Sequence, residues 1–394
     1  DSERTYEFIE KMIVAATAPF RSNRIHIGMD EAHDLGRGRY LDINGASNRF
    51  EVMTRHLKRV VEITNKHNLK PMMWSDMFFR LASKTNEYFD EEAVIPQEVI
   101  AEIPQEVQLV LWDYGHTEEK TYKAFIEKHK TIGFTPIFAG GIHTWNGVCT
   151  QYGKTLSNSD AALAACKKEG VTEVFATIWG DNGTENNFFT TLLGLQCYAE
   201  NDYSSSYNTA SLAKRVEFCT GIEFDAYMKL AQLDEIPHVV THYKDNSNPS
   251  KYLLWQDILL GLFDKHIEKY DVASHYKSLG KELEEYSNKN EKYKLLFDVP
   301  AKLCKVLELK SDMGIRIKKA YDNNERNTLK EILAVELPIL SQRVNDLRIA
   351  HRNQWFKVNK ANGWEDLDVR YGGVLARVDS VIQRLSDYLD GKVQ

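Results

Sequence analysis

Two carboxylates stand side by side directly after an apolar run. Residues 24–29 read Arg-Ile-His-Ile-Gly-Met, and Asp30 and Glu31 follow them without a break. Charged side chains that continue a buried strand are costly unless they serve a function. Paired carboxyl groups are the usual catalysts of glycosidic bond hydrolysis, in which one of them protonates the leaving oxygen. We therefore expect Asp30 and Glu31 to be a catalytic pair.

The adjacency of the two carboxylates restricts the mechanism. Most glycosidases place their two carboxyls on opposite sides of the scissile bond, about 5 to 9 Å apart. Neighbours at the tip of one strand lie on the same side of a bound sugar, so neither can attack the anomeric carbon from the other face. A substrate with a 2-acetamido group supplies its own nucleophile. We expect an ionised Asp30 to hold the acetamido N–H, and a desolvated Glu31 to keep its proton for the leaving oxygen.

The elements that must position this pair are strands alternating with amphipathic helices. Five β-rich runs, apolar at their start and polar or aromatic at their end, cover residues 24–30, 70–76, 107–113, 135–143 and 173–181. This alternation predicts an α/β fold with a parallel sheet. No glycine-rich nucleotide turn follows a strand, so we favour a (β/α)8 TIM barrel over a doubly wound sheet.

The chain divides into a barrel part and a helical part. A closed barrel of this kind needs eight strands, and we interpret the five visible runs as strands four to eight. Residues 1–220 are predicted to be the C-terminal part of the barrel, and residues 221–394 an all-helical C-terminal domain, since apolar residues recur there at helical spacing. We expect the first three strands to precede this sequence in a longer protein. A barrel completed by another chain is the alternative.

Within the helical part, residues 352–373 combine tryptophan with charge. Trp355, Trp364 and Arg370 lie in this segment. We predict a structured loop between helices, and the alternative is a binding surface or a dimer contact.

Composition excludes several classes of function. Fifty Lys and Arg against 57 Asp and Glu give a net charge of -7, which offers no basic field for nucleic acid. The sequence contains no run of 18 apolar residues, so it predicts no membrane-spanning helix. The five cysteines lack metal-ligand spacing, so we expect no disulfide framework, no zinc and a reducing, cytoplasmic compartment. A metal bound by His26, His33 and Asp34 with the carboxylate pair matches no recognised ligand pattern, and no cofactor is expected.

The run His26-Ile27-Gly28-Met29-Asp30-Glu31 resembles the H-x-G-x-D-E signature of glycoside hydrolase family 20. The resemblance implies a retaining exo-β-N-acetylhexosaminidase that removes terminal β-linked N-acetylglucosamine or N-acetylgalactosamine from an oligosaccharide or glycoconjugate. Residues 30–50 are similar to the bacterial, streptococcal-type branch that acts on N-acetylglucosamine ends. The helical tail is similar to the C-terminal region of those enzymes.

The same resemblance implies a sugar pocket at the strand ends. Family members enclose the acetamido methyl between tryptophans, and Trp74, Trp112 and Trp179 match them in kind and order, with simple packing as the alternative. Tyr114 is the candidate donor to the acetamido oxygen. In many family members that tyrosine follows the seventh strand, where this sequence has Gly-Gly-Ile-His-Thr-Trp-Asn-Gly and no tyrosine. Packing at the rim is the alternative for Tyr114.

Further positions complete the predicted pocket. Asp181 matches an acidic residue that binds the 4- and 6-hydroxyls of the sugar, and Trp145 is expected to stack on the sugar or to pack in its loop. His26 is expected to orient the catalytic pair. Asp76, Asp113 and His143 also end strands. An arginine that family members contribute from the first strand lies outside this sequence.

Two other classes of function are alternatives to the hydrolase. A non-catalytic carbohydrate-binding or scaffold fragment agrees with the three missing strands. An aldolase or a metal-dependent hydrolase would need a lysine at a strand end or a ligand cluster, and neither is seen. A homodimer is left open.

Overall fold

The sheet of the computed structural model is parallel. The structure describes residues 2–204, 208–237 and 247–393, and within them five strands pair in chain order, β1-β2-β3-β4-β5. The strands are β1 (Arg24–His26), β2 (Lys70–Trp74), β3 (Gln108–Trp112), β4 (Ile137–Gly141) and β5 (Val174–Thr177). β1 pairs with β2, β2 with β3 and β3 with β4 in parallel. The predicted partial barrel agrees with this sheet.

Side chains from β1, from β3 and from the residue before β5 contact one another across the sheet. Arg24 on β1 donates to Gln108 on β3 at 2.6 Å and forms an ion pair with Glu173, next to β5, at 2.5 Å. Because β1 and β5 are the two edges of the sheet, this ion pair requires the sheet to curve. Interior layers built by alternate strands are the packing pattern of (β/α)8 barrels.

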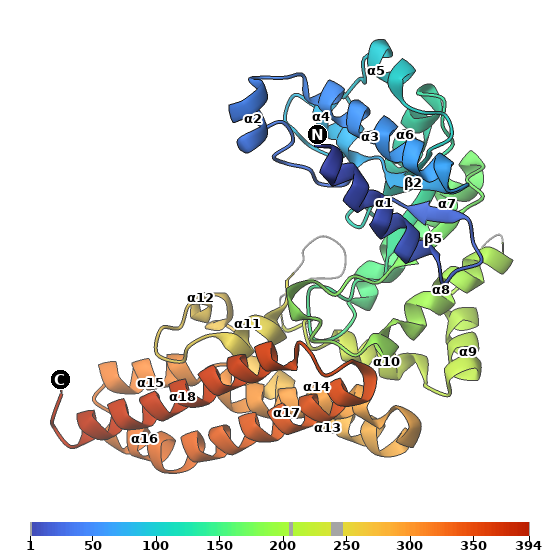
Figure 1. Cartoon of the computed structure of the whole chain (residues 1–394). Coiled ribbons are helices and arrows are strands. Elements are labelled where there is room, and N and C mark those ends of the chain that lie inside the picture. Colours follow the sequence, from blue (N-terminus) through green and yellow to red (C-terminus); the bar gives the residue numbers. More distant parts are fainter. Residues whose placement is uncertain (1, 205–207, 238–246, 394) are drawn as a thin grey trace. The chain divides into compact units, whose positions relative to one another are not determined.

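Helices cover the outer face of the sheet (Figure 1). They are α1 (Glu3–Thr17), α3 (Arg49–Lys66), α4 (Asp76–Ala82), α5 (Gln97–Glu102), α6 (Glu119–Thr131) and α7 (Tyr152–Glu169), while the short α2 (Arg39–Asn44) buries no residue and lies apart from the sheet. α3 is capped by Asn48, the residue before it, whose side chain accepts from the N–H of Phe50, a common N-terminal cap. Leu57 of α3 packs in one buried cluster with Met73 and Leu109 of the strands. This apolar contact attaches the helix layer to the sheet.

Two strands are shorter than their β-rich runs predict. β1 ends at His26, although the run extends to Asp30, because Gly28 and Met29 take positive φ values of 75° and 77°. β5 ends at Thr177, and the chain then turns into a 3-10 turn, η1 (Asp181–Gly183). The predicted catalytic and sugar-binding residues after these strands therefore lie on loops.

Contacts divide the chain into two compact units. The first contains Asp1–Gly140 and Asp160–Ala176, and the second contains Gly141–Ser159 and Thr177–Gln394. The segments that follow β4 and β5 thus group with the later helices. The boundary near residue 220 that the sequence indicates stays a prediction.

The second unit is built mainly from helices around one apolar core. The helices are α8 (Leu192–Tyr203), α9 (Thr209–Thr220), α10 (Phe224–Ala231), α11 (Pro249–Trp255), α12 (Asp264–Ile267), α13 (Val272–Lys289), α14 (Lys294–Lys310), α15 (Met313–Asp322), α16 (Arg326–Glu331), α17 (Leu337–Val358) and α18 (Trp364–Leu389), with short turns η2 (Phe188–Thr191), η3 (Glu291–Tyr293) and η4 (Ile332–Glu336). Leu283, Phe297, Val344 and Val378 contribute to the core. The long helices α13, α14, α17 and α18 lie alongside one another (Figure 1).

Helices occupy most of the segment 352–373, so the predicted loop is wrong there. α17 continues to Val358 and α18 begins at Trp364, which leaves residues 359–363 as the connection. The apolar face of α18, with Leu367 and Tyr371 buried, extends the helical pattern to this point.

Two general properties follow from the described residues. No helix among residues 2–204, 208–237 and 247–393 is long and apolar enough to cross a membrane. All five cysteines are free, and only Cys219 is exposed.

Candidate active site

The backbone turns sharply where β1 ends. Besides Gly28 and Met29, Glu31 has a positive φ, of 49°, and each such conformation costs about 1–3 kcal/mol at a residue other than glycine. The N–H of Trp74 donates to the carbonyl of Gly28 at 3.1 Å, so the turn stays attached to β2. Asp30 and Glu31 lie on this turn with exposed side chains.

Asp76, the first residue of α4, is hydrogen-bonded to the backbone of this turn. Its side chain is 5% exposed, and its Oδ2 accepts a hydrogen bond from the backbone N–H of Glu31 at 3.1 Å. Burial raises the pKa of Asp76 to about 6, and the nearby Asp30 adds to the rise, while hydrogen bonds from Glu31 and Trp112 oppose it. The second oxygen, Oδ1, is buried and has no hydrogen-bond partner among the described residues. Asp76 is therefore a third carboxyl group beside the predicted pair.

His26 is neutral and fixed in orientation. Its Nδ1 accepts from the N–H of Gly28 at 3.1 Å, so the single proton of the neutral ring lies on Nε2. Burial lowers the pKa of His26 to about 4, against the influence of Asp30. The ring lies 4.3 Å from that of Trp74 between centroids. These contacts connect the turn with Trp74, and the tuning of the pair by His26 stays a prediction.

Aromatic rings gather where β3 ends. Trp112 stacks on Tyr114 with centroids 5.1 Å apart and an interplanar angle of 28°. Tyr88 and Phe89 pack against Trp112 at 5.6 and 5.4 Å. Sequence reasoning missed Tyr88 and Phe89, because they belong to the loop between α4 and α5 and follow no strand. Trp74, on the neighbouring strand, is 8% exposed.

Asp113 shapes the turn that carries Tyr114. Its Oδ1 accepts from the N–H groups of Gly115 and His116 at 2.9 and 3.2 Å, and its Oδ2 lies 2.6 Å from Nδ1 of His116. This contact raises the pKa of His116. Both oxygens of Asp113 are engaged within the chain, so its role here is structural.

Six of the predicted residues belong to the first unit. They are His26, Asp30, Glu31, Trp74, Trp112 and Tyr114. One expected feature is missing. The structure contradicts the prediction that Glu31 is desolvated, because its side chain is exposed among the described residues. β1 ends before Asp30, so the turn that carries Glu31 projects from the sheet.

Trp145, Trp179 and Asp181 belong to the second unit. Trp145 stacks on the buried ring of His143 with centroids 4.6 Å apart. The hydroxyl of Thr144 donates to the carbonyl of Trp179 at 2.6 Å. Trp179 and Asp181 are exposed. Their contact with a sugar stays a prediction.

The loop that carries Asp181 has a strained backbone. Asn182 and Thr184 have φ values of 58° and 51°, and the Thr184 hydroxyl donates to the carbonyl of Gly180 at 2.7 Å. A Cβ atom at Gly180 would lie 2.5 Å from that hydroxyl oxygen, so glycine is required for this close approach. The turn after β5 is therefore specified by several residues of the Trp-Gly-Asp-Asn-Gly-Thr run.

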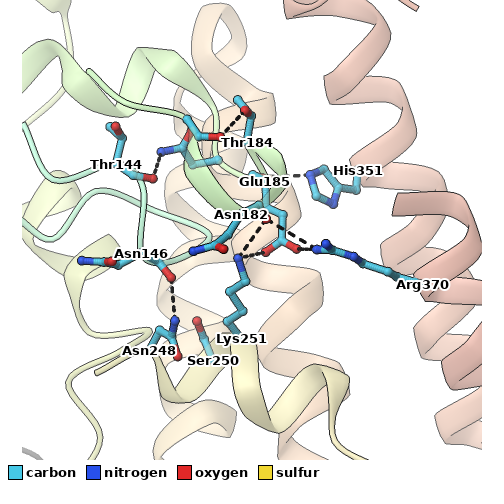
Figure 2. A network of polar contacts seen from close by, with 12 residues as sticks. Thr144, Asn146, Asn182, Thr184, Glu185, Asn248, Ser250, Lys251, His351 and Arg370 are labelled. Atoms are coloured by element: carbon cyan, nitrogen blue, oxygen red, sulfur yellow. Dashed lines mark hydrogen bonds and ion pairs between the residues drawn. The ribbon is translucent and has the colours of Figure 1, made fainter. Parts of the chain in front are cut away.

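Glu185 anchors the same loop to three helices (Figure 2). Its side chain is 1% exposed and forms ion pairs with Arg370 of α18 at 2.9 Å and Lys251 of α11 at 3.1 Å. Nε2 of His351 on α17 lies 2.9 Å from the Glu185 carbonyl oxygen. Sequence reasoning missed Glu185, since a charged loop residue is exposed in most proteins. No sequence signal distinguishes it from its neighbours.

The part of the chain that the structure describes contains no cluster of three or more His, Cys, Asp or Glu side chains suited to a metal ion. The chemistry available at the turn is that of carboxyl groups. Asp30 and Glu31 are accessible for proton transfer and charge stabilisation, and Asp76 fixes the backbone between them.

Comparison with known proteins gives one match that bears on family. Residues 225–394 match the model of the Glycoside Hydrolase 20C C-terminal domain. Among solved structures, a chitobiase of Flavobacterium johnsoniae is similar over 87% of this chain, with 14% identity and a TM-score of 0.34; the chain spans 55% of that protein's length. No curated protein matches the chain. The domain match supports the family that residues 26–31 predict.

Proposed function

We propose that this chain is the part of a family 20 glycoside hydrolase that carries the catalytic pair, and that it removes terminal β-linked N-acetylglucosamine with retention of configuration. The observation that carries the proposal is the adjacency of Asp30 and Glu31 on one turn beside Trp74. Two carboxylates on the same turn suit a substrate that provides its own nucleophile. The match of residues 225–394 supports the family.

In the first step, the acetamido carbonyl oxygen attacks C1 and the C1–O bond to the leaving group breaks. Glu31 gives its proton to the leaving oxygen, while Asp30 accepts a hydrogen bond from the acetamido N–H and stabilises the positive charge of the resulting oxazolinium. Trp74 and Trp112 enclose the acetamido methyl and press its carbonyl toward C1. Tyr114 donates to the acetamido oxygen.

In the second step, water attacks C1 and the C1–O bond of the oxazolinium breaks. The Glu31 carboxylate takes a proton from that water and returns to its starting state. Two displacements at C1 give overall retention. Asp181 and Trp145 bind the terminal sugar in this proposal, and His26 orients the pair.

The proposal includes strands that complete the barrel from polypeptide outside this sequence. β1 lies at one edge of the sheet, and an apolar pocket of about 360 Å³ beside it is lined by Ile9, Met12, Ile25 and Met29, among others. Open strand edges and exposed apolar surfaces are normally covered in stable proteins. Covering strands would also desolvate the turn that carries Glu31.

A substrate with a weaker internal nucleophile tests the mechanism. Replacing the acetamido group by trifluoroacetamido withdraws electrons from the carbonyl oxygen, so kcat/KM should fall by more than about tenfold. The Glu31→Gln protein, purified in the same way, shows whether a contaminating enzyme contributes. Equal rates on both substrates would contradict participation of the acetamido group. Comparison of kcat/KM for the aryl N-acetylglucosaminide and for its 4-epimer, the N-acetylgalactosaminide, tests the gluco preference that the streptococcal-type branch implies.

A non-catalytic carbohydrate-binding fragment is the second candidate. The exposure of Asp30 and Glu31 favours it, because general acid catalysis at neutral pH depends on a desolvated carboxyl group. Saturable binding of N-acetylglucosamine, without hydrolysis of an activated aryl glycoside at any pH from about 4 to about 8, would establish it.

A further inference from the structure

We infer that the helical part of the chain determines how the terminal sugar is recognised, because Glu185 and its three helical partners fix the loop that carries Asp181. The inference rests on the proposed function, in which Asp181 binds the 4- and 6-hydroxyls. Glu185 lies four residues after Asp181 on the same loop. It is a positioning residue that acts through Asp181.

The contacts of Glu185 come from separate helices. Arg370 of α18 and Lys251 of α11 bind its two carboxylate oxygens, Oε1 at 2.9 Å and Oε2 at 3.1 Å, and His351 of α17 contacts its carbonyl (Figure 2). A buried carboxylate is stable only when it is paired. Loss of Arg370 would remove the hydrogen bond to Oε1 and leave the buried carboxylate with the Lys251 ion pair alone.

The two cations also reach the residue next to Asp181. Nζ of Lys251 donates to the carbonyl of Asn182 at 3.2 Å, and Nη1 of Arg370 lies 3.5 Å from the same oxygen (Figure 2). Asn182 has a left-handed backbone. The cations thus hold the turn at both of its ends, at Asn182 and at Glu185.

The donor in the hydrogen bond between His351 and Glu185 can be assigned. Its Nδ1 lies 2.9 Å from the hydroxyl of Tyr371, and its Nε2 faces the carbonyl oxygen of Glu185. A carbonyl oxygen only accepts, so the proton lies on Nε2 and the tyrosine hydroxyl donates to Nδ1. Burial lowers the pKa of His351 to about 4, so this neutral tautomer persists at physiological pH.

The consequence is a specific kinetic effect. A carboxylate discriminates a hydroxyl only when its oxygens are correctly placed, and the loss of such a charged hydrogen bond weakens binding by about tenfold or more. The reaction at C1 uses other residues. Loosening the loop should therefore reduce discrimination at the 4-position while the intrinsic chemistry at C1 is retained.

The test uses Arg370→Met in the protein at its full natural length, with Arg316→Met as the matched control. Arg316 pairs with Glu336 through two bonds of 2.8 and 2.7 Å in the helical part, away from the loop. For each protein, the measured quantity is the ratio of kcat/KM for an aryl N-acetylglucosaminide to kcat/KM for its 4-deoxy analogue. Arg370→Met should lower this ratio by about tenfold, mainly through KM, and Arg370→Lys should restore part of it.

Two further measurements separate the outcomes. Amide hydrogen exchange of residues 178–187 should increase in Arg370→Met and not in Arg316→Met. If Arg370→Met fails to fold, the double variant Glu185→Gln/Arg370→Met removes the unpaired charge and should still show the reduced ratio. A 4-deoxy ratio equal to that of wild type in the folded variant overturns the inference. Absence of hydrolysis by wild type instead overturns the proposed function, and the exchange result then still decides whether Arg370 holds the loop.

Discussion

The backbone N–H of Glu31 donates a hydrogen bond to Oδ2 of Asp76 at 3.1 Å. The donor belongs to a strained turn after β1, and the acceptor is the buried first residue of α4. An exposed carboxyl group is thus held by a buried one, through the backbone. The first two predictions follow from this contact.

Removal of the Asp76 side chain should disorient Glu31. Asp76→Ala leaves the N–H of Glu31 without its acceptor, and a displacement of about 1 Å at a catalytic group can cost about 100-fold in rate. We expect kcat/KM for an aryl N-acetylglucosaminide to fall by about 10- to 100-fold. Asp76→Asn keeps a side-chain carbonyl oxygen as acceptor and should lose less. Equal activity of Asp76→Ala and wild type would contradict this role.

The raised pKa of Asp76 should make stability depend on pH. Burial raises its pKa in the folded state to about 6, against the ordinary aspartate pKa of 3.8. Below pH of about 4 both states bind the proton; as pH rises to about 6 the unfolded state ionises first, so about 3 kcal/mol of stability is lost. Asp76→Asn lacks this group and should lack this decline.

Urea unfolding of both proteins across this pH range checks the second prediction. Asp234 also has a pKa raised to about 6 by burial, and it contributes equally to wild type and to Asp76→Asn. The difference between the two curves therefore isolates Asp76. Parallel curves would show that Asp76 has the same pKa in the folded and the unfolded protein, which would contradict the prediction.

Gly180 should not tolerate a side chain. Its Cβ would lie 2.5 Å from Oγ1 of Thr184, which is itself bonded to the Gly180 carbonyl, so Gly180→Ala should destabilise the protein by about 1–3 kcal/mol. The added change Thr184→Ala should recover part of this loss. Gly372→Ala is the control: it lies in α18 with open space around the Cβ position and should stabilise by about 0.5–1 kcal/mol. Thermal unfolding of the four proteins measures these effects.

Asp30→Asn should slow every substrate. Asp30 is proposed to stabilise the oxazolinium, which forms whatever the leaving group is, so an activated aryl leaving group gives no rescue. We expect kcat to fall by about 100-fold or more on both activated and poor leaving groups. Selective loss on poor leaving groups would instead assign the acid role to Asp30.

The fold could be predicted as far as local pattern and periodicity specify it. Apolar runs that end in polar or aromatic residues predicted the five strands, and helical spacing predicted the long helices from α13 onward. The end of β1 could not be predicted from the sequence. Methionine rarely takes a left-handed backbone, and nothing in the residues around Met29 indicates that it does so here. The same limit applies to the segment 352–373, where tryptophan combined with charge suggested a loop, and α17 and α18 occupy most of it.

The candidate site could be predicted only where a residue's type carries its role. Asp30 and Glu31 were found from their adjacency. Asp76 contacts Glu31 through a backbone N–H 45 residues away in sequence, which no residue pattern encodes. Glu185 and Arg370 are 185 residues apart, and their pairing depends on how α18 packs beside the loop after β5. Long-range polar contacts of this kind require the folded structure.

The most direct test of the catalytic pair is the dependence of Glu31→Gln on the leaving group. The rates of wild type and Glu31→Gln are compared on two aryl N-acetylglucosaminides, one with a strongly acidic phenol and one with a weakly acidic phenol. If Glu31 protonates the leaving oxygen, the variant should lose about 100-fold or more on the weakly acidic phenol and much less on the strongly acidic one. A Glu31→Gln protein that hydrolyses the weakly acidic phenol at the wild-type rate would contradict the account.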